Sequence, residues 1–191
     1  INENVFDNYW EILPIEKTQI TEDKINLKLK KEQSASLFVQ SEKKAVLAIQ
    51  KHAMNIAGKE KNPQMDEAYF LLGESRYYDQ RFIPSLEAFN YILFKYPTSE
   101  LVNKAKIWRE KINAKQNYNQ LAIENLKEIE SRGRLSNEEI VELNAVLAQA
   151  YLNSKKIDSA VIRLETASEK TQDLNSKSRY LFILGQLYKN L

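Results

Sequence analysis

The chain has 191 residues and carries 28 Lys and Arg against 26 Asp and Glu, which gives a net charge of +2 at neutral pH. Charges this balanced, and interspersed along the chain, supply no strong positive field to attract nucleic acid or an anionic lipid surface. The chain contains no cysteine and a single histidine, which excludes disulfides, thiolate catalysis, zinc–thiolate sites and multi-histidine metal sites. Only four glycines and four prolines occur among many good helix formers, so the composition predicts an all-α protein.

The region 1–33 combines an aromatic cluster, VFDNYWEILP, with a charged stretch of little periodicity. Pro14 disfavours helix at Leu13, because its ring clashes with a helical conformation of the preceding residue. We therefore expect a short helix that ends near Trp10 and an extended connector over the rest of the region. The chain begins at Ile1 without Met and stops inside an apolar helical pattern, as a portion of a longer protein would.

Helical periodicity is clear after this region. From Ser34 to Asn55 apolar residues recur three or four positions apart, which predicts one long amphipathic helix. Gly58 and the polar run KEKN predict a loop after that helix. Asn62 and Pro63 then favour a helix start, with Asn as the cap and Pro in the first helical position.

A 34-residue pattern follows, and it repeats. With Asp66 as position 1, the register gives Tyr69 at 4, Leu72 at 7, Gly73 at 8, Ser85 at 20, Phe89 at 24, Ile92 at 27 and Pro97 at 32. A second ungapped match has Leu147 at 7, Ala148 at 8, Tyr151 at 11, Ala160 at 20, Leu164 at 24 and Ala167 at 27. A third, partial match consists of Leu181, Leu184, Gly185 and Tyr188. This register of large and small residues is typical of the tetratricopeptide repeat, in which each unit is a pair of helices.

The small residues at positions 8 and 20 of the repeat have a physical reason. Gly73 with Ser85, and Ala148 with Ala160, would let the two helices of a hairpin approach closely. A glycine in mid-helix costs about 0.5 to 1 kcal/mol relative to alanine, so Gly73 indicates a contact too close for a methyl group. We expect a right-handed superhelical stack of helix hairpins over 34–191, with repeat units near 66–99, 100–133 and 136–172 and a partial unit at 178–191.

The unit near 100–133 is degenerate but still helical. Its apolar residues indicate two helices, with Ala105, Ile107, Trp108 and Ile112 on the first and Ala122, Ile123, Leu126 and Ile129 on the second. Gly133 would end the second helix. Ser136 with Glu139 predicts a capping box at the start of the next one.

The stretch RYYDQRF, from Arg76 to Phe82, has the composition of a stacking and charge patch for single-stranded nucleic acid. In the register of the repeat it is instead a hairpin corner, in which Arg76, Tyr77 and Tyr78 end one helix and the next residues form the turn. Arg76 stands where the repeat usually has a tyrosine, and the repeat alone does not explain it.

The repeat also predicts a surface for a protein ligand. Positions 2, 5, 9, 12 and 13 of each first helix face the concave side of such a stack, and the candidates for partner binding are Glu67, Phe70, Glu74, Tyr77, Tyr78, Gln149, Leu152, Asn153, Phe182 and Gln186. Glu142, Ala145, Arg179, Lys189 and Asn190 hold the same positions in the later units. An aromatic and acidic surface would favour a basic or apolar segment. Alternatively, the rings of Phe70, Tyr77 and Tyr78 pack on the neighbouring hairpin.

The sequence disfavours two further functions, the binding of chaperone tails and enzyme activity. Repeats that clamp the C-terminal carboxylate of a peptide place Lys and Asn where this chain has Phe70 and Glu74, which argues against a receptor for chaperone tails. His52 has no cysteine or second histidine to complete a catalytic or metal constellation. Carboxylate pairs such as Glu138 and Glu139 are typical of solvated helix faces, and no nucleotide-binding glycine motif occurs. We expect no enzyme activity, no cofactor and no metal.

Several stretches resemble one protein family, and the likeness of their amino-acid sequences is far more specific than the repeat pattern. They are AVLAIQKHAMNIAGKEKNPQMDEAYFLLGESRYYDQRFIPSLEAFNYILFKYPTS, AKIWREKIN, LAQAYLNSKKIDSA and RYLFILGQLY, together with NYWEILPIE near the start. The chain resembles the SprE/PorW family of tetratricopeptide lipoproteins, which serve gliding motility and type IX secretion in Bacteroidetes. The resemblance covers most of the sequence.

The resemblance implies a non-catalytic protein–protein interaction scaffold, part of an outer-membrane lipoprotein that faces the periplasm. It implies partners in the type IX translocon and its associated periplasmic subunits, no nucleic acid, and membrane attachment only through a lipid anchor outside this chain, whose cysteine is absent here. Two alternatives stay open: a helical-repeat lipoprotein of the kind that assembles outer-membrane β-barrels, or another peptide-binding adaptor. A nucleic-acid-binding solenoid is a different class, which the near-neutral charge disfavours.

Overall fold

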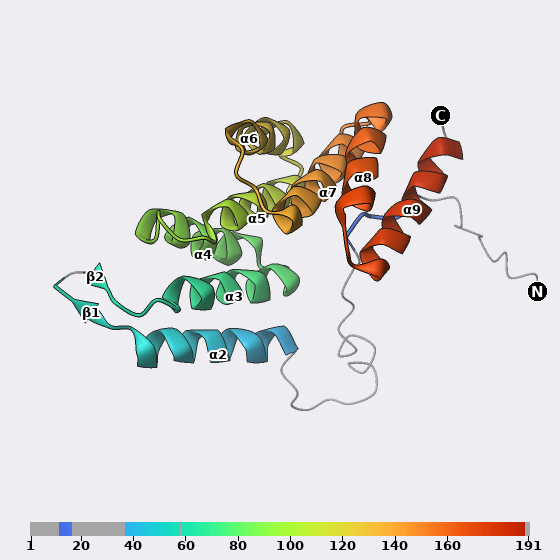
Figure 1. The fold of residues 1–191 in the computed structure, drawn as a ribbon. Helices are drawn as coiled ribbons and strands as arrows, with labels where there is room; N and C mark the ends of the chain where they lie inside the picture. The colour runs from blue at the N-terminus through green and yellow to red at the C-terminus, as the bar shows by residue number, and fades with distance from the viewer. Residues whose placement is uncertain (1–11, 17–36, 58, 190–191) are drawn as a thin grey trace, which may run out of the picture. The chain divides into compact units, whose positions relative to one another are not determined.

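The computed structural model describes residues 12–16, 37–57 and 59–189, and within these ranges it contains eight helices and one short pair of strands (Figure 1). The elements in chain order are α2 (Leu37–His52), β1 (Asn55–Ile56), β2 (Lys59–Glu60), α3 (Met65–Tyr78), α4 (Phe82–Lys95), α5 (Val102–Lys115), α6 (Asn119–Arg132), α7 (Asn137–Asn153), α8 (Ile157–Lys170) and α9 (Leu174–Lys189). The prediction of an all-α protein is confirmed for this part of the chain. No helix in these ranges combines the length and the apolar character needed to cross a bilayer.

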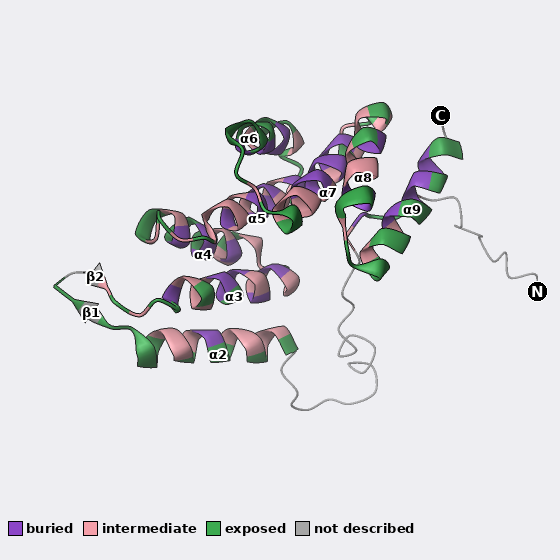
Figure 2. Ribbon diagram, viewed as in Figure 1, coloured by how far each residue is buried: buried purple, intermediate pink, exposed green. Residues whose placement is uncertain are grey.

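The chain divides into two compact units. The first is Thr18–Lys115 and holds α2 to α5, and the second is Ile1–Lys17 together with Gln116–Leu191 and holds α6 to α9. The boundary that the sequence predicts near residue 33 lies outside the described residues and stays a prediction. In the first unit α2 packs on α3, α3 on α4 and α4 on α5, and in the second α6 packs on α7, α7 on α8 and α8 on α9. The helices bury one side and expose the other, as amphipathic helices do (Figure 2).

The first unit is packed around Phe89 of α4, which is fully buried. A Cβ atom at Gly73 of α3 would lie 2.7 Å from two carbon atoms of the Phe89 ring, closer than real Cβ contacts come. The hydroxyl of Ser85 donates a hydrogen bond of 2.7 Å to the carbonyl oxygen of Gly73, so α3 and α4 touch at this point. The predicted close approach of Gly73 and Ser85, and the predicted reason for the glycine, are confirmed.

Two hairpin corners have the same geometry. Between α3 and α4, Gln80 has a left-handed φ of 63° and its N–H donates to the carbonyl oxygen of Tyr77 at 2.9 Å. Between α7 and α8, Lys155 has a φ of 59° and its N–H donates to the carbonyl oxygen of Leu152 at 2.9 Å. RYYDQRF is therefore a hairpin corner, as its register predicted, although α4 begins at Phe82 and includes its last residue.

The second unit is packed around α7 and α8. Ala148 and Ala160 are fully buried, as predicted for the small positions of the repeat. The capping box of α7 is also confirmed: Ser136 Oγ accepts a hydrogen bond of 3.2 Å from the N–H of Glu139, and the Glu139 carboxylate accepts one of 2.7 Å from the N–H of Ser136. Gly133, with a left-handed φ of 65°, ends α6 where expected.

The helix predicted from Ser34 to Asn55 is α2, but it ends at His52, and Asn55 lies in β1. The loop after α2 contains a feature that the sequence did not predict. The strands β1 and β2 pair antiparallel across the turn. Glu60 Oε1 accepts hydrogen bonds from the backbone N–H groups of Asn62, Met54 and Lys61 at 2.9, 2.8 and 3.0 Å. These bonds hold the turn and lower the pKa of Glu60 below its ordinary value.

The start of α3 differs from expectation in detail. The helix begins at Met65 rather than at Pro63. Asn62 Oδ1 accepts a hydrogen bond of 3.0 Å from the N–H of Gln64, so Asn62 closes a turn ahead of the helix instead of capping it. The short helix expected to end near Trp10 lies outside the described residues, as does most of the expected connector.

Candidate functional site

Two aromatic candidates on α3 belong to the core of the first unit. Phe70 and Tyr77 are each 4% exposed. Phe70 packs edge-on against Phe89 and Trp108, with ring centroids 5.2 and 5.8 Å apart, and Tyr77 meets Trp108 edge-on at 5.3 Å. Side chains this buried have little surface left for a partner. For these two residues the structure favours the alternative interpretation, packing on the neighbouring hairpin.

Lysines of α5 cover the faces of the same rings. Lys104 Nζ lies 4.8 Å from the centroid of the Phe70 ring. Lys111 Nζ lies 4.1 Å from the centroid of Trp108 and 5.2 Å from that of Tyr77. Cation–π contacts of this kind stabilise by about 0.5 to 1 kcal/mol at exposed sites. A basic ligand segment would have to displace these lysines, so the ring faces are already occupied within the chain.

The other candidates on α3 are more accessible. Glu67 is exposed, and Glu74 and Tyr78 are half-buried. The Tyr78 ring stacks on Phe38 of α2 with a centroid separation of 5.4 Å and meets Trp108 of α5 edge-on at 5.8 Å. Tyr78 therefore links α2 to the aromatic core while part of its ring faces solvent.

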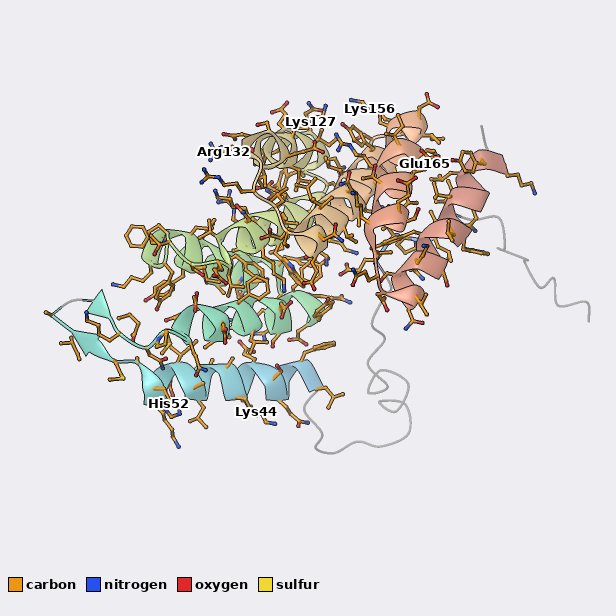
Figure 3. The ribbon with its side chains drawn as sticks, viewed as in Figure 1. Lys44, His52, Lys127, Arg132, Lys156 and Glu165 are labelled. Atoms are coloured by element: carbon orange, nitrogen blue, oxygen red, sulfur yellow. The ribbon has the colours of Figure 1, made fainter. Side chains whose placement is uncertain are left out.

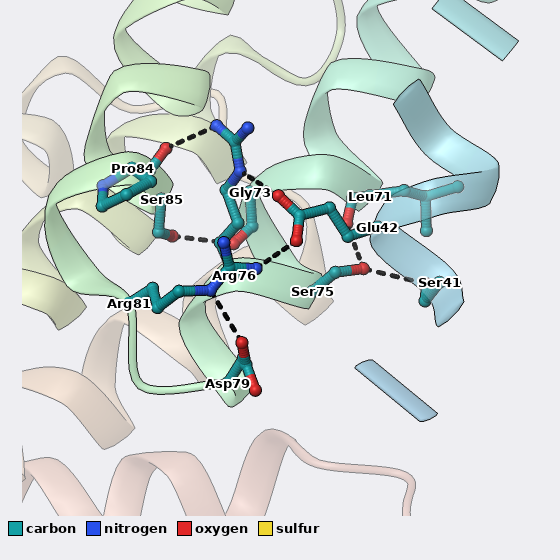
Figure 4. A network of polar contacts seen from close by, with 10 residues as sticks. All are labelled: Ser41, Glu42, Leu71, Gly73, Ser75, Arg76, Asp79, Arg81, Pro84 and Ser85. Carbon is teal, nitrogen blue, oxygen red and sulfur yellow. Dashed lines mark hydrogen bonds and ion pairs between the residues drawn. The ribbon is translucent and has the colours of Figure 1, made fainter. Parts of the chain in front are cut away.

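Arg76, which the repeat left unexplained, joins three helices (Figure 4). Its Nε donates a hydrogen bond of 2.8 Å to Glu42 of α2, and a terminal nitrogen donates one of 3.0 Å to the carbonyl oxygen of Pro84 on α4. Arg81 pairs with the same Glu42 carboxylate and with Asp79. Burial raises the pKa of Glu42, but the hydrogen bonds and charges of the two arginines outweigh burial and hold the pKa below its ordinary value. Arg76 is a structural residue of the first unit.

In the second unit, a short non-helical segment of residues 12–16, drawn in blue in Figure 1, is hydrogen-bonded to α7 and α9. We call it the N-terminal segment. The N–H of Leu13 donates a hydrogen bond of 3.1 Å to Gln186 Oε1 on α9, and the N–H of Ile15 donates one of 2.9 Å to Gln149 Oε1 on α7.

Arg179 of α9 binds the carbonyl groups of the same segment. Its Nε donates a hydrogen bond of 2.9 Å to the carbonyl oxygen of Ile15, and a terminal nitrogen donates one of 2.6 Å to that of Pro14. Arg179 and Gln186 stand seven positions apart, about two helical turns, and therefore share one face of α9. We call Gln149, Arg179 and Gln186 the α7/α9 site. It binds the main chain of the N-terminal segment through both N–H and carbonyl groups.

One side chain anchors the N-terminal segment in the core. Ile15 is 4% exposed and packs in a cluster with Ala148, Val161, Leu164, Ala167, Tyr180, Ile183, Leu184 and Leu187. Ile12, Ala145 and Leu152 are half-buried against this cluster. Burial of an isoleucine side chain stabilises by about 1.5 to 3 kcal/mol. Pro14, between the two bound N–H groups, is exposed and has no N–H of its own to satisfy.

Two of the predicted partner-binding residues, Gln149 and Gln186, thus bind an extended segment. Leu152 packs beside it. Asn153 is exposed: its Oδ1 accepts a hydrogen bond of 2.9 Å from Gln149, and its amide donates one of 3.0 Å to Asn119. Phe182 is 40% exposed on α9. The sequence placed Arg179 among the concave positions but not among the candidates, and it did not predict that the N-terminal segment would lie here.

Titratable side chains in the described ranges show no metal constellation. No group of three or more His, Asp or Glu side chains in these ranges is placed to hold a metal ion. His52 is exposed at the last residue of α2 (Figure 3). Glu128 pairs with Arg132 on an exposed face of α6, as expected for solvated carboxylates.

Comparison with known proteins gives no match, either among protein-family models or among curated proteins. The resemblance to the SprE/PorW family stays a prediction from the sequence stretches quoted above. What the structure adds is independent of any family: two helical units, one of which holds the N-terminal segment at the α7/α9 site.

Proposed function

We propose that this chain is a non-catalytic protein–protein interaction scaffold, built of tetratricopeptide hairpins in a right-handed superhelical stack, that binds extended segments of partner proteins. The observation that carries the proposal is the α7/α9 site. There, Gln149, Arg179 and Gln186 make four hydrogen bonds to the main chain of the N-terminal segment. Recognition of this kind is what a peptide-binding scaffold requires.

Packing inside the hairpins supports the repeat architecture. Gly73 with Ser85 in one unit, and Ala148 with Ala160 in the other, occupy equivalent positions of the 34-residue pattern, and all four residues are buried. The corners at Gln80 and Lys155 share the same left-handed turn. Burial of small residues at equivalent positions is expected of repeats that stack on one another.

The family resemblance supports the cellular role. We propose that the chain is part of an outer-membrane lipoprotein that faces the periplasm and is required for type IX protein secretion, and for gliding where the organism glides. Its partners are then proteins of the type IX translocon and its associated periplasmic subunits. The lipid anchor lies outside this chain.

The experiment uses the full-length, membrane-anchored protein in a gliding member of the Bacteroidetes. The double variant Gln149→Ala/Arg179→Ala removes side chains of the α7/α9 site. The matched control, Gln120→Ala/Arg132→Ala, removes the same two side-chain types from the exposed surface of α6. We expect the site variant to lose co-purifying secretion subunits and to secrete less type IX cargo, while the control behaves as wild type.

The proposal fails if the site variant melts at the wild-type temperature yet captures the same partners and secretes at the wild-type level. A loss of capture in both variants would also count against it, because the effect would then not depend on the α7/α9 site.

A further inference from the structure

The occupant of the α7/α9 site belongs to the chain itself. Four hydrogen bonds that hold it involve its main-chain atoms, which almost any sequence could offer. Its side chains add two requirements. Ile15 fills a position enclosed by the core of the second unit, and Ile12 packs half-buried beside it, so both positions ask for an aliphatic residue.

The residue between the two bound N–H groups is the third requirement. Pro14 stands between the two residues whose N–H groups the glutamines bind, and it brings no N–H of its own that would need a partner. Proline has no such N–H and restricts φ to about −65°, which favours an extended conformation before binding. Less conformational entropy is then lost when the segment is ordered on the helices.

We propose that the N-terminal segment is a tethered ligand of the α7/α9 site, and that the site accepts partner segments of the same chemistry: an extended peptide with proline between two aliphatic residues. This inference rests on the proposed function and adds to it the class of ligand and the means of control. A tethered ligand competes at a high effective concentration, so a partner must displace the chain's own segment before it binds.

The core of the second unit does not depend on Ile15 alone. Leu147, Leu164, Ile183 and Leu187 are all fully buried between α7, α8 and α9. The helices are also connected in sequence and packed in consecutive pairs. We therefore expect the second unit to stay folded when the N-terminal segment leaves. A unit that unfolded without the segment would instead need it as part of its structure.

The test is a fluorescence anisotropy titration with a labelled peptide, WEILPIEKT, the sequence of residues 10–18. It is added to the whole 191-residue chain and to an Ile15→Asp variant, in which a buried carboxylate would expel the tethered segment. We expect the variant to bind the peptide about tenfold more tightly than wild type, or better. Adding Arg179→Ala to the variant should abolish the gain, whereas adding Arg132→Ala should preserve it.

Two control peptides define the ligand class. Replacing the peptide residue that corresponds to Ile15 by Asp should abolish binding, because the aliphatic anchor is lost. Replacing its Pro by Ala should weaken binding several-fold, because the free peptide is then less restricted. Equal binding of all three peptides would overturn the assignment of the ligand class.

The inference is overturned if Ile15→Asp keeps the helical circular dichroism of wild type and binds the peptide no better. A milder variant, Ile15→Ser, covers the case in which the aspartate unfolds the unit. If both variants unfold the second unit, the segment is a structural strand and the inference is also overturned. The readout is a defined peptide in vitro, whereas the proposed function is read by partner capture and secretion in cells, so each can fail without the other.

Discussion

The ring of Phe89 lies so close to Gly73 that a methyl group on the glycine would stand 2.7 Å from two ring carbons. The ring cannot move easily, because it is fully buried and is packed against Phe70 and Trp108. We therefore expect Gly73→Ala to lower the free energy of unfolding by about 1 to 3 kcal/mol, even though alanine is the better helix former. Urea unfolding followed by far-UV circular dichroism measures the change.

Gly185 is the matched control for this prediction. It also lies inside a helix, α9, but a Cβ atom there would meet nothing within 4 Å. Gly185→Ala should then leave stability unchanged or raise it by up to about 1 kcal/mol. If both substitutions stabilise the chain, the close contact of Gly73 with Phe89 does not exist.

Truncation of Phe89 tests the core of the first unit. Phe89→Ala removes a fully buried ring and should lower the free energy of unfolding by about 3 to 5 kcal/mol. Phe94, on the same helix, is 84% exposed, so Phe94→Ala should change stability by less than about 0.5 kcal/mol. Similar melting temperatures for the two variants would contradict the assigned faces of α4.

The ion pairs of Glu42 give stability a dependence on pH. Arg81 and Arg76 hold the pKa of Glu42 below its value in the unfolded chain, about 4.5. The folded chain therefore binds fewer protons, and the contribution is fully present above pH 4.5 and decreases as the pH falls through the folded-state pKa. We expect it to be no more than about 1 kcal/mol, because Arg81 is partly exposed and solvent screens the pair.

Glu42→Gln is the variant that checks this contribution. The variant should be less stable than wild type at pH 7, and the difference should shrink as the pH falls below the unfolded-state pKa. Glu128→Gln is the control, since Glu128 and its partner Arg132 are both well exposed and should contribute little at any pH. A difference for Glu42→Gln that stays constant down to pH 2 would show that the carboxylate charge is not involved.

Much of the helical packing could be predicted from the sequence, because its signals are local. Gly73, Ser85 and Phe89 stand at fixed spacings in one hairpin, and the structure places them in contact. The capping box of Ser136 and Glu139 was likewise visible within four residues. The pair β1 and β2 was missed because its strands are two residues long and are held by the Glu60 carboxylate, which leaves no periodic signal.

The candidate site was predictable only in part. The repeat register identified Gln149 and Gln186, and the structure brings both to one segment. It could not identify the segment, because Ile15 is 134 residues from Gln149 and Leu13 is 173 residues from Gln186 in the sequence. The register also could not predict which aromatic side chains of α3 are accessible to a partner, because Trp108 and the lysines of α5 cover some of them.

Amide hydrogen exchange at Leu13 and Ile15 tests the central claim most directly, namely that the α7/α9 site binds the main chain of an extended segment. NMR of the whole chain would compare wild type, Arg179→Ala and the control Arg132→Ala. We expect both amides to exchange at least about tenfold more slowly than in an unfolded peptide, although neither lies in a helix or strand. This protection should be lost in Arg179→Ala and kept in Arg132→Ala. Unprotected amides in the wild-type chain would contradict the account.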